Sequence, residues 1–341
     1  MRNTKLVVMT NLKVWPNVCK PIMNNIHQPV LLNEVLSFVE YRSNLTTYCD
    51  FTIGYGGHAT AIWKKINQTK SQLIGFDHDL DAYNYCNEHL GITKLQLVHD
   101  NFVNFEKYFR QWQLFQIDFA LLDLGVSSKQ LDDPNRGFSY QHNGPFDMRM
   151  NQKQYLPASQ YVLKTPLNQL IQIFKHYGEI KNPVHVASQM KKYVKEHGDK
   201  TTTLAISELI KANVPVRQLY AKKHTSRLYF QALRIAVNDE LNTLSKFLKM
   251  IPNYLANNSI LCIITFHSLE EKIVKNAFHK LINPVNLTGV PINPLHFSQY
   301  ELLTHKPITA SKSELLTNHR SRSAKLFVLH KKGTIANYVQ S

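Results

Sequence analysis

Short apolar runs recur along the first part of the chain, and they alternate with segments of helical character. One run leads into the glycine-rich stretch 54–58, another covers 95–99, and two more end at Asp77 and Asp123. Alternation of this kind predicts a parallel sheet with crossover helices. Ligands bind beyond the carboxyl ends of such strands. We therefore expect the glycine-rich stretch, Asp77 and Asp123 to surround one binding site in an α/β domain.

The alternation stops after Asp123 and resumes near the end of the chain. Residues 125–150 are rich in Gly, Pro, Asp, Asn and Ser and read as a long loop, which in a compact domain is often functional. Helical spacing of apolar residues follows, and a buried strand over 259–266 restores the α/β pattern. The predicted division is a leader at 1–26, the first part of the α/β domain at 27–149, a helical insertion at 150–222, and the second part with a basic tail at 223–341.

The chain is strongly basic, with a formal net charge of +16. Residues 151–225 hold 12 Lys and Arg against 4 Asp and Glu, so the insertion supplies half of this charge. Such a balance favours a polyanionic partner, although lysines also form ordinary solvated helix faces. We expect the insertion to dock RNA, and the candidate contacts in it and in the tail are Lys191, Lys192, Lys195, Lys200, Arg320, Arg322 and Lys325.

Several classes of protein are disfavoured. The four cysteines form no CxxC pair, which leaves a zinc knuckle unsupported, and no apolar run is long enough to span a membrane. The leader contains no acidic residue before Glu34. It is either an organelle-targeting segment or an extension upstream of a natural start at Met23, and the second interpretation is favoured. We expect a cytoplasmic, reduced protein without metal; the oligomeric state is not predictable from the sequence.

The chemistry of the strand ends favours a nucleotide-like ligand. The stretch from Gly54 to Ala59 fits G-x-G-x-x-A after a strand, where glycine lets the backbone approach a ligand. Asp77, 23 residues after Gly54, suits the hydroxyl groups of an adenosyl ribose. These features fit NAD and S-adenosylmethionine equally well, and an ordinary turn would also explain the glycines. Asp123 beside a turn of small residues suits a cationic sulfonium, or caps a helix.

Ten blocks, in order from about His27 to Lys325, resemble the RsmH (MraW) family. The glycine loop, the Gly75-Phe76-Asp77 block and the Asp123-Leu124-Gly125 block are among them. The others include His27-Gln28-Pro29, Arg136-Gly137-Phe138, Asp147-Met148-Arg149-Met150, Tyr177-Gly178-Glu179, Phe230-Gln231-Ala232, Val237-Asn238-Asp239-Glu240 and Phe266-His267-Ser268.

This resemblance implies a Rossmann-like domain that binds S-adenosyl-L-methionine and is interrupted by a helical domain. It implies methylation of the N4 amine of a cytidine in the decoding region of 16S rRNA, with the small-subunit rRNA or the small ribosomal subunit as partner. The cofactor contacts that carry over by motif position are Gly56, Gly57, His58, Asp77, Phe102, Asp123 and Gln130.

The candidates for the catalytic pocket are Asp123, Asp147, Arg149 and His267. A hydrogen-bond acceptor at the cytosine amine would help to localise its delocalised lone pair, and Arg149 would position a phosphate or a base. Asp147 and Arg149 could equally form a salt bridge that holds the loop, and His267 could be a helix cap. Competing functions are methylation of another RNA or DNA amine, a NAD-dependent oxidoreductase, and a non-catalytic rRNA-binding assembly factor.

Overall fold

The computed structural model describes residues 29–39, 46–66, 68–215, 225–283 and 298–333, so the predicted leader 1–26 lies outside the described residues. The helices of the sheet domain are α1 (Leu32–Phe38), α2 (Gly57–Lys65), α3 (Leu80–His89), α4 (Phe105–Gln111), α5 (Ser128–Asp132), α12 (Glu240–Met250), α13 (Ser268–Ile282) and α14 (Lys312–Thr317). The strands are β1 (Thr47–Asp50), β2 (Gln72–Asp77), β3 (Leu95–His99), β4 (Ile117–Asp123), β5 (Leu255–Thr265), β6 (Tyr300–Leu302), β7 (Ile308–Thr309) and β8 (Lys325–Lys331).

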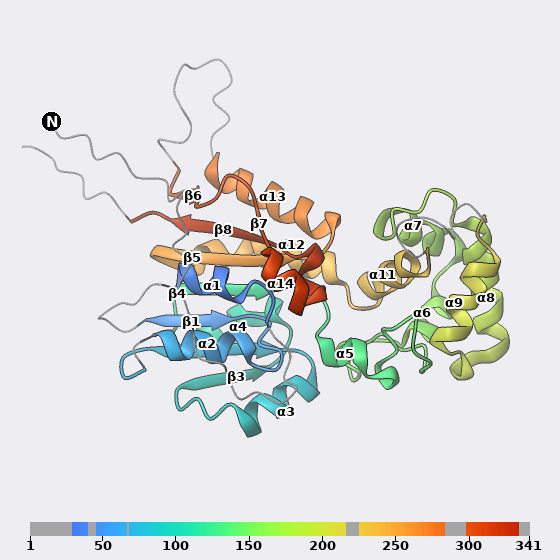
Figure 1. Cartoon of the computed structure of the whole chain (residues 1–341), viewed down its shortest axis with the longest axis horizontal. Coiled ribbons are helices and arrows are strands. Elements are labelled where there is room, and N and C mark those ends of the chain that lie inside the picture. The colour runs from blue at the N-terminus through green and yellow to red at the C-terminus, as the bar shows by residue number, and fades with distance from the viewer. Residues whose placement is uncertain (1–28, 40–45, 67, 216–224, 284–297, 334–341) are drawn as a thin grey trace, which may run out of the picture.

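These strands form one sheet in the order β3-β2-β1-β4-β5-β8-β6, with β7 also paired to β8 (Figure 1). Strands β1 to β5 are parallel, whereas β8 runs antiparallel to β5. The order reverses between β1 and β4, where adjacent connections leave toward opposite faces and open a crevice at the strand ends. The parallel α/β domain predicted from the sequence is confirmed.

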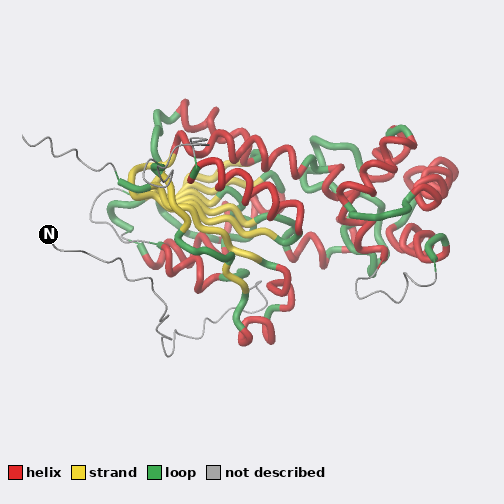
Figure 2. Tube along the Cα trace, turned by 90° about the horizontal axis from the view of Figure 1, so that it is seen from above, coloured by secondary structure: helices red, strands yellow, loops and turns green. Residues whose placement is uncertain are grey.

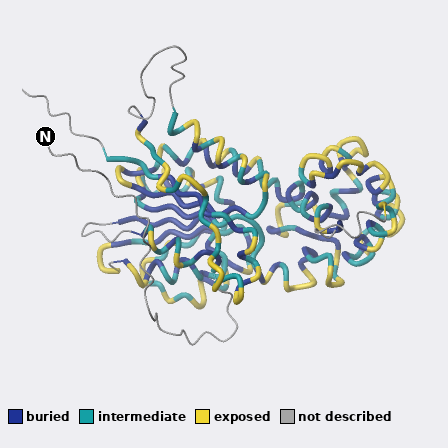
Figure 3. The backbone as a smooth tube through the Cα atoms, turned by 45° about the horizontal axis from the view of Figure 1, so that its top comes forward, coloured by how far each residue is buried: buried dark blue, intermediate teal, exposed yellow. Residues whose placement is uncertain are grey.

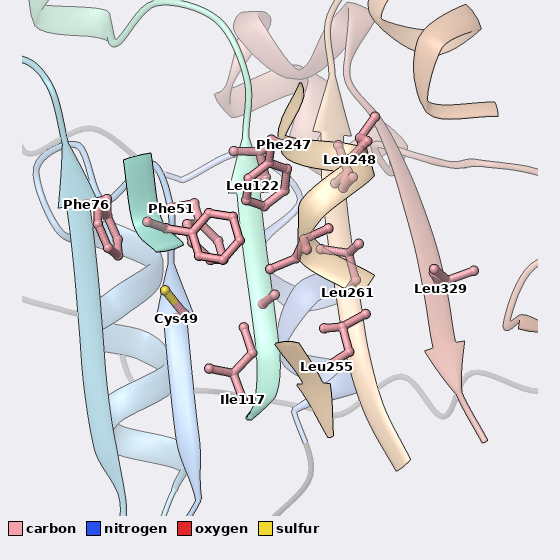
Figure 4. Packing of buried hydrophobic residues seen from close by; sticks show 14 of the residues in the cluster. Cys49, Phe51, Phe76, Ile117, Leu122, Phe247, Leu248, Leu255, Leu261 and Leu329 are labelled. Atoms are coloured by element: carbon pink, nitrogen blue, oxygen red, sulfur yellow. The ribbon is translucent and has the colours of Figure 1, made fainter. Parts of the chain in front are cut away.

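Both faces of the sheet are covered by helices, as Figure 2 shows. Adjacent strand residues point to opposite faces, so Cys49 packs in one apolar cluster and Tyr48 in the other. Phe51 anchors the first cluster, with its ring centroid 4.8 Å from that of Phe247 on α12 (Figure 4). Burying both faces explains why β5 reads as a nearly continuous apolar run and not as an alternating one.

A second unit of helices stands beside the sheet domain (Figure 1). It consists of α6 (Ala158–Lys164), α7 (Leu167–Tyr177), α8 (Val184–His197), α9 (Thr203–Ala212) and α11 (Thr225–Val237). Its core also contains Phe138, Phe146 and Met148 from the preceding loop. The predicted boundaries of the insertion, 150–222, are therefore too narrow: α11 was assigned to the second part of the α/β domain, but Tyr229 and Leu233 bury their side chains in the helical unit.

The two units differ in what they expose. Figure 3 shows buried strands at the centre of the sheet domain and exposed positions along the outer helices of the helical unit. None of the described helices is long and apolar enough to cross a membrane. The predicted basic tail belongs to the sheet domain, because Ser321 and Ala324 are buried just before β8.

Candidate active site

A cavity of about 520 Å³ opens over the carboxyl ends of β1, β2 and β4. Residues that directly follow the strands form its walls, and they include Gly54, His78, Phe102, Leu124 and Phe266. Most of these residues come from segments that the sequence had placed at strand ends. The size suits a ligand of drug-like dimensions, for which pockets of about 300–1,000 Å³ are typical.

The β1–α2 loop turns sharply at its glycines. Gly54 and Gly56 have φ values of 54° and 78°, a left-handed region that glycine adopts without strain. Gly54, Gly57 and His58 line the cavity. Gly56 does not, because its Cα faces Leu90, whose side chain would lie 2.4 Å from an added Cβ. Of the three predicted cofactor contacts in this loop, Gly57 and His58 line the cavity, whereas Gly56 only shapes the loop.

Asp77 ends β2 and faces the cavity. One carboxylate oxygen accepts from the backbone N–H of Gly54 and the other from that of Asp79, both at 2.8 Å. Burial raises the pKa of Asp77 to about 6, although these two hydrogen bonds oppose the shift. Because each carboxylate oxygen can accept two hydrogen bonds, the carboxylate fixes the loop and still has acceptor capacity toward the cavity.

Phe102 supplies an aromatic wall. It follows Asn101 after β3, lines the cavity, and contacts Phe247 edge-to-face with ring centroids 5.3 Å apart. The Asn101 side chain accepts from the backbone N–H of Val103 and is buried. Packing against Phe247 holds the Phe102 ring in place, so a flat, apolar surface is ready for an adenine-sized ring.

Asp123 at the end of β4 is an unusual carboxyl group. Its backbone N–H donates to Thr52 Oγ1, and its Oδ2 lies 3.8 Å from His58 Nδ1, while His58 Nε2 contacts the carbonyl oxygen of Val30. Among the described residues, its Oδ1 is buried without a hydrogen-bond partner. Burial raises the pKa of Asp123 well above its ordinary value, and the charges of Asp50 and Glu270 add to the shift. Such a group suits a ligand with a hydrogen-bond donor or a positive charge.

Gln130 lies in a buried polar network that the sequence analysis did not assign to the site. Its Nε2 donates to Asp79 at 2.6 Å, and its Oε1 accepts from the backbone N–H of Ser127 in a capping box. Arg136 donates to the same Asp79 oxygen at 2.9 Å and to the backbone carbonyls of Arg149 and Met150. The sequence contained a signal for this network, since Asp79 and Arg136 stand beside or within the blocks that resemble the family.

A second ionic network borders the cavity, where Glu240 and Glu270 line the wall. Arg234 donates to both Glu240 oxygens, at 2.9 and 3.0 Å. His267 caps α13 through Nδ1, and its Nε2 lies 3.1 Å from Glu270. Although burial alone would raise the pKa of Glu270, the contacts with His267 and Arg234 bring it below its ordinary value. His267 is thus the helix cap that the sequence left open, and it does not line the cavity.

Ligand-atom spacing alone would allow Glu240, His267 and Glu270 to hold a metal ion, because their donor atoms lie within 4.8 Å of one another. Arg234 already supplies a positive charge to Glu240 there. His267 Nε2 lies 3.1 Å from Glu270 but makes no hydrogen bond among the described residues.

Asp147 and Arg149 lie away from the cavity wall. Arg149 Nε and Nη2 donate to the two Asp147 oxygens at 2.8 and 2.7 Å, and Met148 between them has a left-handed φ of 62°. A bidentate pair of this kind holds the loop in a tight bend. Of the two roles left open by the sequence, the structural salt bridge is the one that this geometry favours.

The predicted RNA contacts separate into two groups. Lys191 Nζ donates to the carbonyls of Val162, Leu163 and Thr165 and so caps the end of α6, which corrects its prediction as a phosphate contact. Arg320 pairs with Asp132 at the cavity rim, and Lys325 pairs with Glu271. The remaining four are exposed: Lys192, Lys195, Lys200 and Arg322.

The sequence profile of the MraW methylase family matches residues 24–332. This chain belongs to the MraW methylase family. Its relatives include the ribosomal RNA small subunit methyltransferases H of Mycoplasmoides gallisepticum, 46% identical over 91% of this chain and 98% of the relative, and of Mycoplasma genitalium, 40% identical over 91% and 100%. A third, from Halothermothrix orenii, is 38% identical over 89% and 97%.

Family membership identifies the chain as a methyltransferase that uses S-adenosyl-L-methionine. The cavity fits this cofactor, since carboxyl groups of Asp77 and Asp123 face a space that must hold a cationic ligand. The resemblance found in the sequence is thereby confirmed, whereas the individual contacts at Gly57, His58, Asp77, Phe102, Asp123 and Gln130 stay predictions.

Proposed function

We propose that this protein methylates the N4 amine of a cytidine in the decoding region of 16S rRNA. The relatives are named as methyltransferases of small-subunit ribosomal RNA, which supports the choice of substrate. The observation that carries the proposal is Asp123, which lines the cavity and whose Oδ1 has no hydrogen-bond partner among the described residues. When bound, S-adenosyl-L-methionine supplies an electrophilic methyl group on a sulfonium.

The part of Asp123 in this reaction is to accept a hydrogen bond from the target amine. Delocalisation into the ring makes the N4 lone pair a poor nucleophile, and an acceptor at one N–H helps to localise that pair. Asp123 Oδ1 has no partner among the described residues, and the backbone of Asp123 is fixed by its N–H donating to Thr52 Oγ1. A preorganised acceptor costs no reorganisation at the moment of transfer.

The wall beside Asp123 positions the base. Phe266 lines the cavity beside Leu124 and Gly125, and its ring lies 3.4 Å from the position of a Cβ on Gly125. We assign Phe266 as an apolar surface for the target ring and Glu240, fixed by Arg234, as a second polar contact. A base can reach this wall only from a single strand or after it has flipped out of a duplex.

The helical unit docks the RNA. Lys192 and Lys195 are exposed on α8, and Lys200 is exposed in the turn that follows it. Lysines in such a row neutralise successive phosphates without reading sequence. We take the small ribosomal subunit as the partner and the cytoplasm as the compartment.

The decisive experiment is methyl transfer from labelled cofactor to small subunits that lack the modification, followed by mapping of the labelled nucleoside. We expect label in one N4-methylated cytidine, and we expect Asp123→Ala, which removes the acceptor, to lower kcat by about 10²–10³-fold, the scale for losing one oriented polar group. Label at another amine would replace the proposed target. Binding of rRNA without any transfer would favour an assembly factor.

A further inference from the structure

A carboxylate from the helical unit reaches the first turn of α13 in the sheet domain. Ser268 Oγ donates to Glu179 Oε2 at 3.2 Å, between residues 89 positions apart. Ser268 begins α13, and Phe266 and Glu270 on either side of it line the cavity. The hydrogen bond therefore joins the two units beside the site, next to the wall to which we assign the target base.

The turn that carries Glu179 is held in a strained conformation. Glu179 has a φ of 52°, a left-handed value that a non-glycine residue adopts only where its surroundings impose it. Gly178 before it is buried, and a Cβ there would lie 2.8 Å from the carbonyl oxygen of Phe174. Ile180 after it is buried too, and its N–H donates to the same oxygen at 3.2 Å. Both neighbours are thus fixed, while the Glu179 side chain is exposed and directed at α13.

The left-handed backbone at Glu179 has an energetic cost that its surroundings must offset. The contact with Ser268 is a use of this conformation that the structure shows. Non-glycine residues in left-handed conformations are frequent at sites where geometry serves function.

We propose that the Glu179–Ser268 hydrogen bond is a positioning contact for methyl transfer. It fixes the helical unit relative to the cavity, so that an RNA held by the helices presents its target nucleotide at the correct depth. Glu179 acts through Ser268 and touches neither cofactor nor base. The inference rests on the proposed docking role of the helical unit. In it, the lysines determine the affinity for RNA, and Glu179 determines the geometry of methyl transfer.

Three variants separate positioning from folding. Glu179→Asn keeps a residue type that tolerates the left-handed turn but shortens the side chain, so the melting temperature should not fall while kcat falls about 10- to 100-fold. Glu179→Gln keeps the length and an acceptor oxygen, and kcat should stay within about threefold of the parent. Ser268→Ala removes the donor and should lower kcat as Glu179→Asn does. The double variant that combines Glu179→Asn with Ser268→Ala should lose no more than either single change, because both remove one interaction.

The assay uses the full chain and measures kcat, KM for small subunits and cofactor affinity. The enzyme concentration is taken as the concentration of cofactor-binding sites. Unchanged KM and cofactor affinity with a lower kcat support the positioning role. A Glu179→Gln variant as impaired as Glu179→Asn would mean that the charge itself is needed, and additive losses in the double variant would mean that the residues act separately; either overturns the proposal. Parent protein that binds subunits but does not methylate them refutes the proposed function instead, and an unaltered subunit affinity after loss of the lysines refutes the docking role alone.

Discussion

Asp77 offers the sharpest test of the cofactor site. Its carboxylate accepts two backbone hydrogen bonds that shape the loop, and it faces the cavity with acceptor capacity left for two ribose hydroxyls. Replacing it with alanine removes these contacts. A hydrogen bond to a charged group contributes about 1.5–3 kcal/mol, so Asp77→Ala should weaken binding of S-adenosyl-L-methionine about 10- to 150-fold.

Titration calorimetry measures this loss directly, and Glu88→Ala on the outer side of α3 is a matched control, because Glu88 is exposed and lies outside the cavity wall. Thermal unfolding of the free protein should show that the fold survives. Titration of the parent protein with S-adenosylhomocysteine and with NADH separates the methyltransferase from the oxidoreductase interpretation. Unchanged cofactor affinity in an intact Asp77→Ala protein would refute the ribose-binding role.

Three further outcomes are expected. Burial raises the pKa of Asp50 to about 7 and that of Asp77 to about 6. Folding therefore takes up protons, and the free protein should lose stability as pH rises from about 4 to 7. A cationic cofactor should bind more tightly over the upper part of that range, and its binding should release protons that calorimetry detects. Neutralising the exposed Lys192, Lys195 and Lys200 should weaken RNA binding and flatten its salt dependence without changing cofactor affinity. An unaltered salt slope would identify these three lysines as a solvated helix face. Lys191→Ala, in contrast, should mainly lower the melting temperature. Removing residues 1–22 should leave activity and melting temperature nearly unchanged, and a large drop in melting temperature would show that the leader belongs to the fold.

The sheet and its strand ends were predictable because both depend on local pattern. An apolar run that ends in a carboxylate records where a buried strand meets solvent, and Asp77 and Asp123 stand at such ends. The short strands β6 and β7 were missed, since β7 has only two residues and no periodicity of its own. Their pairing with β8 is decided by the rest of the sheet.

Roles that depend on a distant partner were not predictable. Lys191 lies in a run of basic residues, but its ammonium group turns inward to the end of α6, 26 to 29 residues earlier. In the same way, helical spacing predicted α11 correctly but could not say which unit its apolar face covers. Spacing shows that a face is buried, whereas the partner of that face comes from tertiary packing.

Three hydrogen-bonding residues, Arg136, Asn238 and Glu179, explain how the helical unit is held beside the cavity. Arg136 binds Asp79 near the cofactor end and the carbonyls of residues 149 and 150 in the loop that enters the helical unit. Asn238 binds the backbone of Met148 and Met150 where α11 leaves that unit. Glu179 reaches Ser268 at the start of α13, between Phe266 and Glu270 of the cavity wall. Arg136 and Asn238 both bind the backbone of Met150, whereas Glu179 binds Ser268 on α13. Their loss should therefore differ in effect: Arg136 couples to cofactor binding through Asp79, whereas Glu179 couples only to the docked RNA.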